Sequence, residues 1–324
     1  MRIPIFEKIN LKHFINKCFN SDKKKFVKYS RTVKTEGRDH ISAQISLYTH
    51  VVEKGLTMPE MRLGFGQEVL CKLMGLCQIW ADKYDKTDPF YVQAVRTILE
   101  YKQLHTRLNY NFEDSFRSNL ESFVIVHSDY SPSEQLVFDG SEQFFSANIE
   151  TFPTFAHSRH SVRNFSDEEI PLQILTDSID LAQSAPSSCN RQTTRVHVLS
   201  DKTDIRNVLS LQNGNRGFGH LVDKLLVITY NTSCYGSVKE RHLGYIDAGL
   251  FTMNLLYALH YNRVGACTLN WCDSPTEDAK LRSIVKIDDS ETIVLFIACG
   301  KVPSHSFLVP ISQKNKGDII TTIH

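Results

Sequence analysis

Apolar residues recur at helical spacing through most of the first 130 positions. The first such run has apolar residues on one face and reaches Gly55, a residue type that favours helix C-caps. A later run opens at Asp88-Pro89, an N-cap residue followed by proline at the first helical position. We expect helices over residues 41–55, over 67–83, from 89 onward, and over 113–123. These patterns predict an all-α N-terminal region.

The second half of the chain mixes strand and helix patterns. Strands are expected at 194–199, 225–230, 266–270 and 292–299, and helices at 171–183, 204–211 and 243–261. The last of these helices is apolar on more than one side, so we expect it to be buried almost all round. The fold class predicted is α+β, with a mixed or antiparallel sheet flanked by helices.

The length of 324 residues exceeds that of a usual single domain, and the 41% apolar and 23% charged residues are typical of folded proteins. We expect a helical region over residues 1–150 and a second domain over 151–324. The eight cysteines are scattered without a CxxC pair, which favours reduced thiols. Without a signal-peptide pattern, a cytoplasmic location is expected.

Charge is unevenly distributed, although the net charge is only +1. Residues 1–35 hold ten Lys or Arg against two acids, and residues 4–19 place apolar side chains among lysines. Such a segment is suited to peripheral contact with an anionic membrane surface, or to packing against the body of the protein, which we favour. Basic residues confined to one end, outside any known motif, argue against nucleic-acid binding.

Two other patterns are judged by their spacing. His50 and Glu53 lie three apart on one helix face, but no second ligand pair accompanies them. We therefore expect a surface or capping role for them and no metal site. No GxGxxG follows a strand, which excludes a Rossmann dinucleotide site.

The first candidate motif is the segment His157–Phe165. We expect a helix here, in which Arg159 and Arg163 share one face, and their guanidinium groups, with the Ser161 hydroxyl, suit a single phosphate. The alternative is a pair of surface arginines at the start of a helix.

Two further motifs contain small residues. Residues 185–192 read APSSCNRQ, and their small and amide side chains suit a turn that closely approaches a flat, polar-edged ligand. An ordinary helix-to-strand turn is the alternative. Ala248 and Gly249, near the start of the long helix, allow close approach of another backbone, such as that of a second subunit.

The chain resembles the nitroreductase family over about residues 152–324. The resemblance is carried, in order, by RHSVRNF, APSSCNRQ, GNRGFG, YIDAGLFTMNLLYALH and IACGKVP. It implies an α+β homodimer with FMN at the subunit interface. It also implies hydride transfer from NADH or NADPH, through FMN, to a small-molecule substrate in a ping-pong cycle.

The resemblance also assigns roles to residues. Residues 159–163, with Arg159, His160, Ser161 and Arg163, would contact the FMN phosphate and ribityl group. Pro186, Ser187, Ser188 and Asn190 of the partner subunit would line the flavin ring, with Gln192 supporting their loop. Thr268, Leu269 and Asn270 would also contact the cofactor, and the backbone of Leu269, Asn270 and Trp271 would lie near flavin N5. Lys314, or alternatively Lys316, would replace the arginine of a phosphate clamp.

The sequence departs from the family at two positions. Many relatives have glycine where this chain has Trp271, which argues against ordinary nitroaromatic reduction. Gly219 stands where some members have an asparagine facing the flavin.

The alternative function is a protein that docks to a membrane or a pathway through its N-terminal region. Its flavin domain would then be structural or would catalyse dehydrogenation or dehalogenation.

Overall fold

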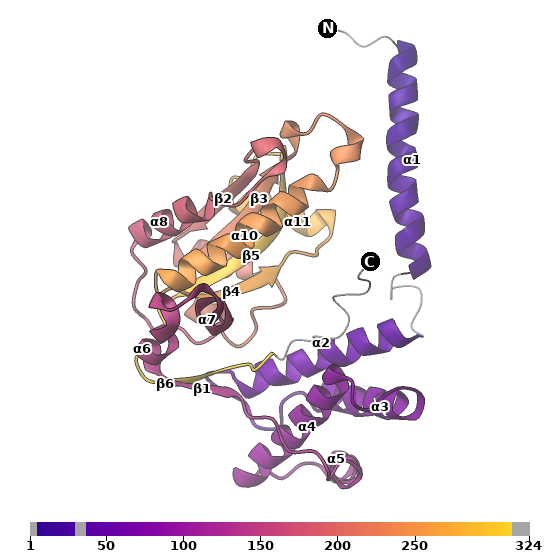
Figure 1. The fold of residues 1–324 in the computed structure, drawn as a ribbon, viewed down its shortest axis with the longest axis vertical. Helices are drawn as coiled ribbons and strands as arrows, with labels where there is room; N and C mark the ends of the chain where they lie inside the picture. The colour runs from indigo at the N-terminus through magenta and orange to yellow at the C-terminus, as the bar shows by residue number, and fades with distance from the viewer. Residues whose placement is uncertain (1–4, 30–36, 313–324) are drawn as a thin grey trace. The chain divides into compact units, whose positions relative to one another are not determined.

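The computed structural model describes residues 5–29 and 37–312 (Figure 1). The chain divides into two compact units. One contains the described residues up to Leu136 together with residues 310–312, and the other spans Val137–Val309. None of the described helices contains a stretch that is long and apolar enough to cross a membrane.

The N-terminal unit is helical, as its periodicity predicts. Its helices are α1 (Ile5–Tyr29), α2 (Arg38–Leu56), α3 (Gln67–Lys83), α4 (Pro89–Arg107) and α5 (Asp114–Val126). Helix α2 packs against α3 and α4. Their apolar faces enclose a core in which Trp80, Tyr91 and Tyr101 are fully buried.

Two expectations about α2 are wrong in detail. The helix continues through Gly55 and ends at Leu56, with Thr57 as its C-cap. Gly55 serves packing instead, because a Cβ atom there would lie 2.0 Å from Cε2 of Phe65. Glu53 is not at the surface: it is only 3% exposed and accepts a hydrogen bond from Gln93 Nε2 at 2.6 Å.

The second unit is α+β, which confirms the predicted fold class. Its strands are β1 (Leu136–Asp139), β2 (Thr194–Leu199), β3 (Lys224–Asn231), β4 (Gly265–Asn270), β5 (Glu291–Gly300) and β6 (Ser306–Val309). Its helices are α6 (Gly140–Phe144), α7 (Phe152–Ser158), α8 (Leu172–Ala182), α9 (Lys202–Ser210), α10 (Leu243–Tyr261) and α11 (Pro275–Ile284). Strands β2, β3, β5 and β4, in that order, form an antiparallel sheet, while β1 and β6 pair separately.

The central strand β3 is covered on both faces. Leu226 and Ile228 join the apolar core formed with α8 and α10, and the alternate residues Leu225 and Val227 are also fully buried. Figure 1 shows α10 running across this sheet with α8 beside it. A strand with two buried faces needs a continuous apolar run, which LLVI (residues 225–228) provides.

The long helix α10 is only partly buried within the chain, contrary to the expectation of burial all round. Ala248, Leu255 and Leu259 face the core. Ile246 and Leu250 are 54% and 46% exposed, and the neighbouring Tyr245 and Met253 are exposed too. A helix lying on a sheet buries one face there, so the chain leaves the other apolar face of α10 uncovered.

The short elements near residue 140 were not predicted. Strand β1 and helix α6 contain four and five residues, too few to show a hydrophobic period. Gly140, at φ 83°, joins them, and a Cβ atom there would lie 2.3 Å from the carbonyl oxygen of Ser304. The turn depends on the pairing of β1 with β6, which the local sequence does not indicate.

Candidate functional site

The arginine motif forms an arm beside β4 and not a helix. Helix α7 ends at Ser158, and Arg159 has extended backbone angles, φ −72° and ψ 119°. The Val162 amide donates to the Ala266 carbonyl at 3.0 Å, and the Ser166 amide donates to that of Lys301 at 2.9 Å. The predicted sharing of a helix face is therefore wrong.

Both arginines have buried, unsatisfied N–H groups. Arg163 is 9% exposed, and its Nε and Nη1 atoms have no hydrogen-bond partner among the described residues. The Nε atom of Arg159 is also buried without a hydrogen-bond partner among the described residues. Burial lowers the pKa of the Arg159 guanidinium. Buried cationic donors without an acceptor cost several kcal/mol, so they favour binding of an anion.

A neutral histidine lies close to Arg159. His260 of α10 is buried, and its Nε2 lies 3.0 Å from Ser158 Oγ. Burial, with smaller contributions from Arg159 and His160, lowers the pKa of His260 to about 4. The rings of Phe144, Phe145 and Phe155 surround it. His260 is therefore uncharged near neutral pH, and Arg159 carries the positive charge of this neighbouring pair.

The GNRGFG loop, residues 214–219, folds against the end of β4 through Gln212. The Nε2 atom of Gln212 donates to the Asn270 carbonyl at 3.1 Å, and its Oε1 accepts from the Gly214 amide at 2.6 Å. Asn215 fills the space above Gly219, where a Cβ atom would lie 2.4 Å from Asn215 Oδ1. A side chain at position 219, where some relatives have asparagine, would have to displace the Asn215 amide.

Strand β4 is an edge strand, so alternate backbone groups point away from β5. The carbonyls of Ala266 and Asn270 face the open edge, because they accept from Val162 and Gln212. By the same alternation, the N–H and C=O groups of Thr268 face that edge, whereas those of Leu269 face β5. This favours Thr268 over Leu269 as a backbone donor to a ligand.

Trp271 packs onto the sheet of its own unit. Its ring lies 5.2 Å from that of Phe296, at an interplanar angle of 43°. Leu269 is buried, whereas Thr268 and Asn270 are exposed. The polar side chains of this segment are therefore the accessible ones.

The APSSCNRQ loop has an unusual backbone. Cys189, Asn190 and Gln192 have φ angles of 53°, 53° and 50°, in the left-handed region. Each such residue costs of order 1 kcal/mol when it is not glycine. The surrounding structure must therefore hold this conformation.

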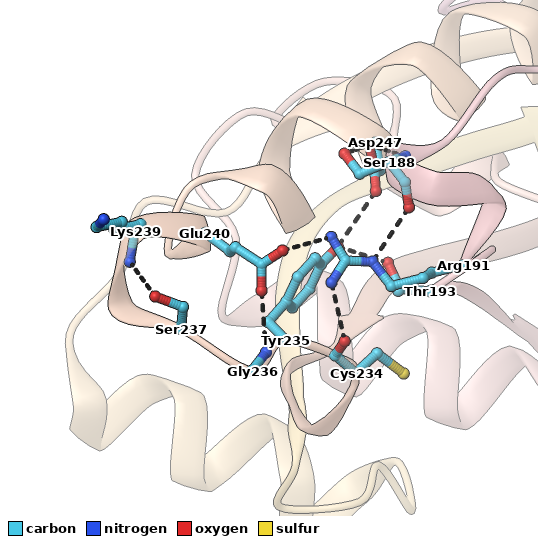
Figure 2. A network of polar contacts seen from close by, with 10 residues as sticks. All are labelled: Ser188, Arg191, Thr193, Cys234, Tyr235, Gly236, Ser237, Lys239, Glu240 and Asp247. Atoms are coloured by element: carbon cyan, nitrogen blue, oxygen red, sulfur yellow. Dashed lines mark hydrogen bonds and ion pairs between the residues drawn. The ribbon is translucent and has the colours of Figure 1, made fainter.

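Figure 2 shows the contacts that hold the loop. The amide and the hydroxyl of Ser188 both donate to Oδ1 of Asp247, at 3.0 and 2.9 Å. The hydroxyl of Tyr235 lies 3.3 Å from Oδ2 of the same carboxylate. Asp247 lies on α10 and is only 2% exposed. Burial is the main cause that raises the pKa of Tyr235, which therefore stays protonated as a donor.

Arg191 adds a second anchor. Its Nε donates to the Ser188 carbonyl at 3.1 Å, its Nη1 to the Cys234 carbonyl at 3.2 Å, and its Nη2 to Glu240 at 2.9 Å. The guanidinium also lies 4.7 Å from the centre of the Tyr235 ring. These contacts join the loop to residues 234–240.

The fold brings some of the predicted site residues together and separates others. Residues 159–163, the GNRGFG loop and Thr268–Trp271 meet around β4. Residues 186–190 precede β2, at the opposite edge of the sheet. With four strands about 4.8 Å apart, that is roughly 14 Å away. Lys314 and Lys316 lie outside the described residues.

Asp247, Arg191, Glu240 and Gln212 were not assigned roles from the sequence. For Asp247 a signal existed, since a carboxylate within an otherwise apolar helix needs a partner. Arg191 and Glu240 are 49 residues apart, and no local pattern links them.

Comparison with known proteins gives one family match. The model described as the nitroreductase family matches residues 156–213, which include the arm and the APSSCNRQ loop. No curated protein matches the chain.

Several solved structures are similar over about half of the chain. A Parabacteroides distasonis protein, described as an NADH dehydrogenase or NAD(P)H nitroreductase, is 20% identical, with a TM-score of 0.43, over 51% of this chain and 92% of its own. A Clostridium acetobutylicum protein, described as an NADH oxidase, is 18% identical, with a TM-score of 0.44, over 52% of this chain and 97% of its own. An FMN-dependent nitroreductase from Clostridium difficile is 19% identical, with a TM-score of 0.42, over 52% and 96%.

The match to residues 156–213 agrees with the resemblance read from the motifs. Residues 156–213 are therefore similar to the nitroreductase family, and that match supports an oxidoreductase.

Proposed function

We propose that the chain is an FMN-dependent oxidoreductase, which transfers hydride from NAD(P)H to a small-molecule substrate in a ping-pong cycle. The observation that carries the proposal is the set of buried, unsatisfied nitrogen atoms on Arg159 and Arg163, in the arm beside β4. An anionic phosphate supplies the acceptors that these donors lack. The family match over the same arm adds support.

The residues around β4 fit FMN. Arg159, Ser161 and Arg163 would hold the phosphate end, and the open backbone edge at Thr268 would face the polar part of the ring. Bound FMN supplies reversible hydride acceptance, which no protein side chain provides. The chain's contribution is to bind, to orient, and to place backbone donors where negative charge develops.

We further propose a homodimer in which residues 186–190 reach the flavin bound to the other copy. Within one copy these residues and the arm lie at opposite sheet edges. Ala185 and Pro186 line a groove of about 560 Å³ together with the exposed α10 residues Tyr245, Ile246 and Leu250. A second copy seated on this groove would cover the apolar face of α10.

The test is to purify the protein, record its visible spectrum, and add NADH or NADPH without oxygen. We expect flavin absorption that bleaches on reduction, with FMN as the released cofactor. Protein that carries no flavin, and takes up none when FMN is added, would disprove the proposal.

A second candidate function is peripheral attachment to an anionic membrane through α1. Between residues 11 and 29 the sequence has six lysines and one acid. The apolar side chains of Leu11, Phe14, Phe19 and Phe26 are exposed. At 100° per residue these four, with Cys18, fall on one side of the helix, opposite Asn20. Lysines beside exposed aromatic residues suit anionic lipid.

Flotation of the full-length protein with vesicles tests this attachment. We expect binding to phosphatidylglycerol vesicles, little binding to phosphatidylcholine, and weakening at high salt. Phe14→Ser with Phe19→Ser should abolish binding, whereas Asn20→Ser on the opposite face should not. Equal recovery of all three proteins with vesicles would exclude a role for α1.

A further inference from the structure

One carboxylate fixes the centre of the APSSCNRQ loop. Asp247 accepts from the Ser188 amide, the Ser188 hydroxyl and the Tyr235 hydroxyl (Figure 2). A carboxylate has only acceptors, so it can serve three donors at once. An amide in its place would turn an NH₂ group toward at least one of those donors. The arrangement therefore suits the acid better than the amide, because with an amide the Tyr235 hydroxyl would have to accept there and donate to Thr193 instead.

The contacts also decide which groups of the loop point outward. The amide, hydroxyl and carbonyl of Ser188 are all used within the chain. Ser187 Oγ accepts from the Gln192 amide at 3.0 Å. Asn190 Oδ1 accepts from Gln192 Nε2 at 3.1 Å. Among the described residues no hydrogen bond uses the NH₂ group of Asn190, whose side chain is exposed.

We propose that Asp247 is the positioning residue of this loop. It holds Ser188, and through it the left-handed residues Cys189 and Asn190, so that the Asn190 amide is presented as a donor to an acceptor-rich ring edge. The inference rests on the proposed function, because that ring is the flavin bound across the subunit interface. It assigns Ser188 to support of the loop and Asn190 to contact.

Tryptic cleavage measures the positioning without flavin. In the native full-length protein, the bond after Arg191 is protected because its guanidinium is anchored on three sides. We expect Asp247→Asn to speed cleavage between Arg191 and Gln192 by about tenfold or more, as local opening becomes easier. Mass spectrometry follows this cleavage relative to that after Arg206, an exposed residue of α9.

Flavin binding measures the consequence of the positioning. Quenching of FMN fluorescence should show the dissociation constant raised by about tenfold in Asp247→Asn, with a shifted flavin absorption maximum. Ser188→Ala removes only the hydroxyl contact and tests the same link if Asp247→Asn does not fold. Ser188→Thr, which keeps a hydroxyl, should restore most of the affinity. Asp180→Asn, on an exposed carboxylate of α8, is the matched control.

The outcomes separate the two proposals. If wild-type protein binds no FMN, the proposed function fails, while cleavage after Arg191 still reports whether Asp247 holds the loop. Unchanged cleavage in both Asp247→Asn and Ser188→Ala would overturn the positioning role. Faster cleavage with unchanged FMN affinity would overturn it equally, because the loop would then not position the flavin.

Discussion

At the residue scale, Arg163 shows a conflict between stability and binding. Its guanidinium is buried beside β4 with two nitrogen atoms unsatisfied. A buried cation without a partner destabilises the fold, whereas the same group binds a phosphate strongly because little water must be displaced. Arg163 thus lowers the stability of the free protein and strengthens binding of a phosphate ligand.

Arg163→Met should expose this conflict. The apoprotein should be as stable as wild type or more so, because the variant removes an unpaired buried charge. FMN affinity should fall by about tenfold to hundredfold, the equivalent of a charge-assisted hydrogen bond of about 1.5–3 kcal/mol. Thermal unfolding in phosphate-free buffer and FMN titration measure the two effects.

Arg206→Met, which alters an exposed arginine on α9, is the control for Arg163→Met. It should change neither the thermal stability of the apoprotein nor the FMN affinity. A destabilised Arg163→Met apoprotein with unchanged FMN affinity would contradict the anion site.

His260 predicts a dependence of stability on pH. Its pKa is about 4 in the folded chain, below the value of about 6.5 expected when unfolded. The unfolded state therefore binds the proton more readily. The stability due to the neutral ring is complete above about pH 6.5 and is lost as pH falls toward 4.

Between about pH 7.5 and pH 5, His260 should account for a loss of about 2 kcal/mol in the free energy of unfolding. His260→Gln keeps a hydrogen-bonding partner for Ser158. Its free energy of unfolding should fall over this interval by about 2 kcal/mol less than that of the wild type. Urea unfolding at both pH values measures the difference. Parallel losses in the two proteins would show that His260 does not titrate as described.

At the element scale, α2 shows why a glycine is ambiguous in a sequence. Gly55 comes after a helical run, where a C-cap is the usual explanation, yet the helix continues through it. The Phe65 ring lies where its side chain would be, and that ring also contacts Tyr101 edge-on at 5.2 Å. The glycine is needed by a neighbour ten residues later in the chain.

Gly55→Ala should therefore destabilise the N-terminal unit by about 1–3 kcal/mol through overpacking, despite alanine's higher helix propensity. Gly75→Ala, inside α3 where a Cβ atom meets nothing within 4 Å, should stabilise it by roughly 0.5–1 kcal/mol. In a Trp271→Phe background, Trp80 is the remaining tryptophan and reports urea unfolding of this unit. If both substitutions changed the free energy of unfolding in the same direction, the packing role of Gly55 would be refuted.

At the scale of the whole molecule, the uncovered face of α10 is the main feature. The helix is apolar on more than one side, but the chain supplies a partner for only one. Apolar area left in water is the usual mark of an association surface. The groove beside it includes Pro186, which links association to the loop proposed to reach the flavin.

Leu250→Glu should give a monomer with FMN affinity reduced by at least about tenfold, because a buried charge at an interface costs several kcal/mol. Leu181→Glu is a matched control, since Leu181 is 49% exposed against 46% for Leu250 but lies on α8. Analytical ultracentrifugation and FMN titration give the two readouts. A wild-type monomer that binds FMN tightly would disprove the shared site.

Local patterns alone predicted most of the elements. The predicted ranges of α3, β2 and α10 agree with the structure, and those of β3 and β5 differ by a residue or two at their ends. Periodicity suffices there because each element has enough residues to show which face is buried. The motif order also predicted the nitroreductase resemblance, which the family match to residues 156–213 supports.

Tertiary structure decided how those pieces are used. It replaced the predicted helix of Arg159–Arg163 with an arm along β4, because the edge strand offers backbone acceptors there. It turned Asp247 into the acceptor for Ser188, 59 residues earlier in the chain. Spacing along a sequence reports which residues share a face of one element. Which groups from different elements meet, and which stay unpaired, depends on packing that no local pattern encodes.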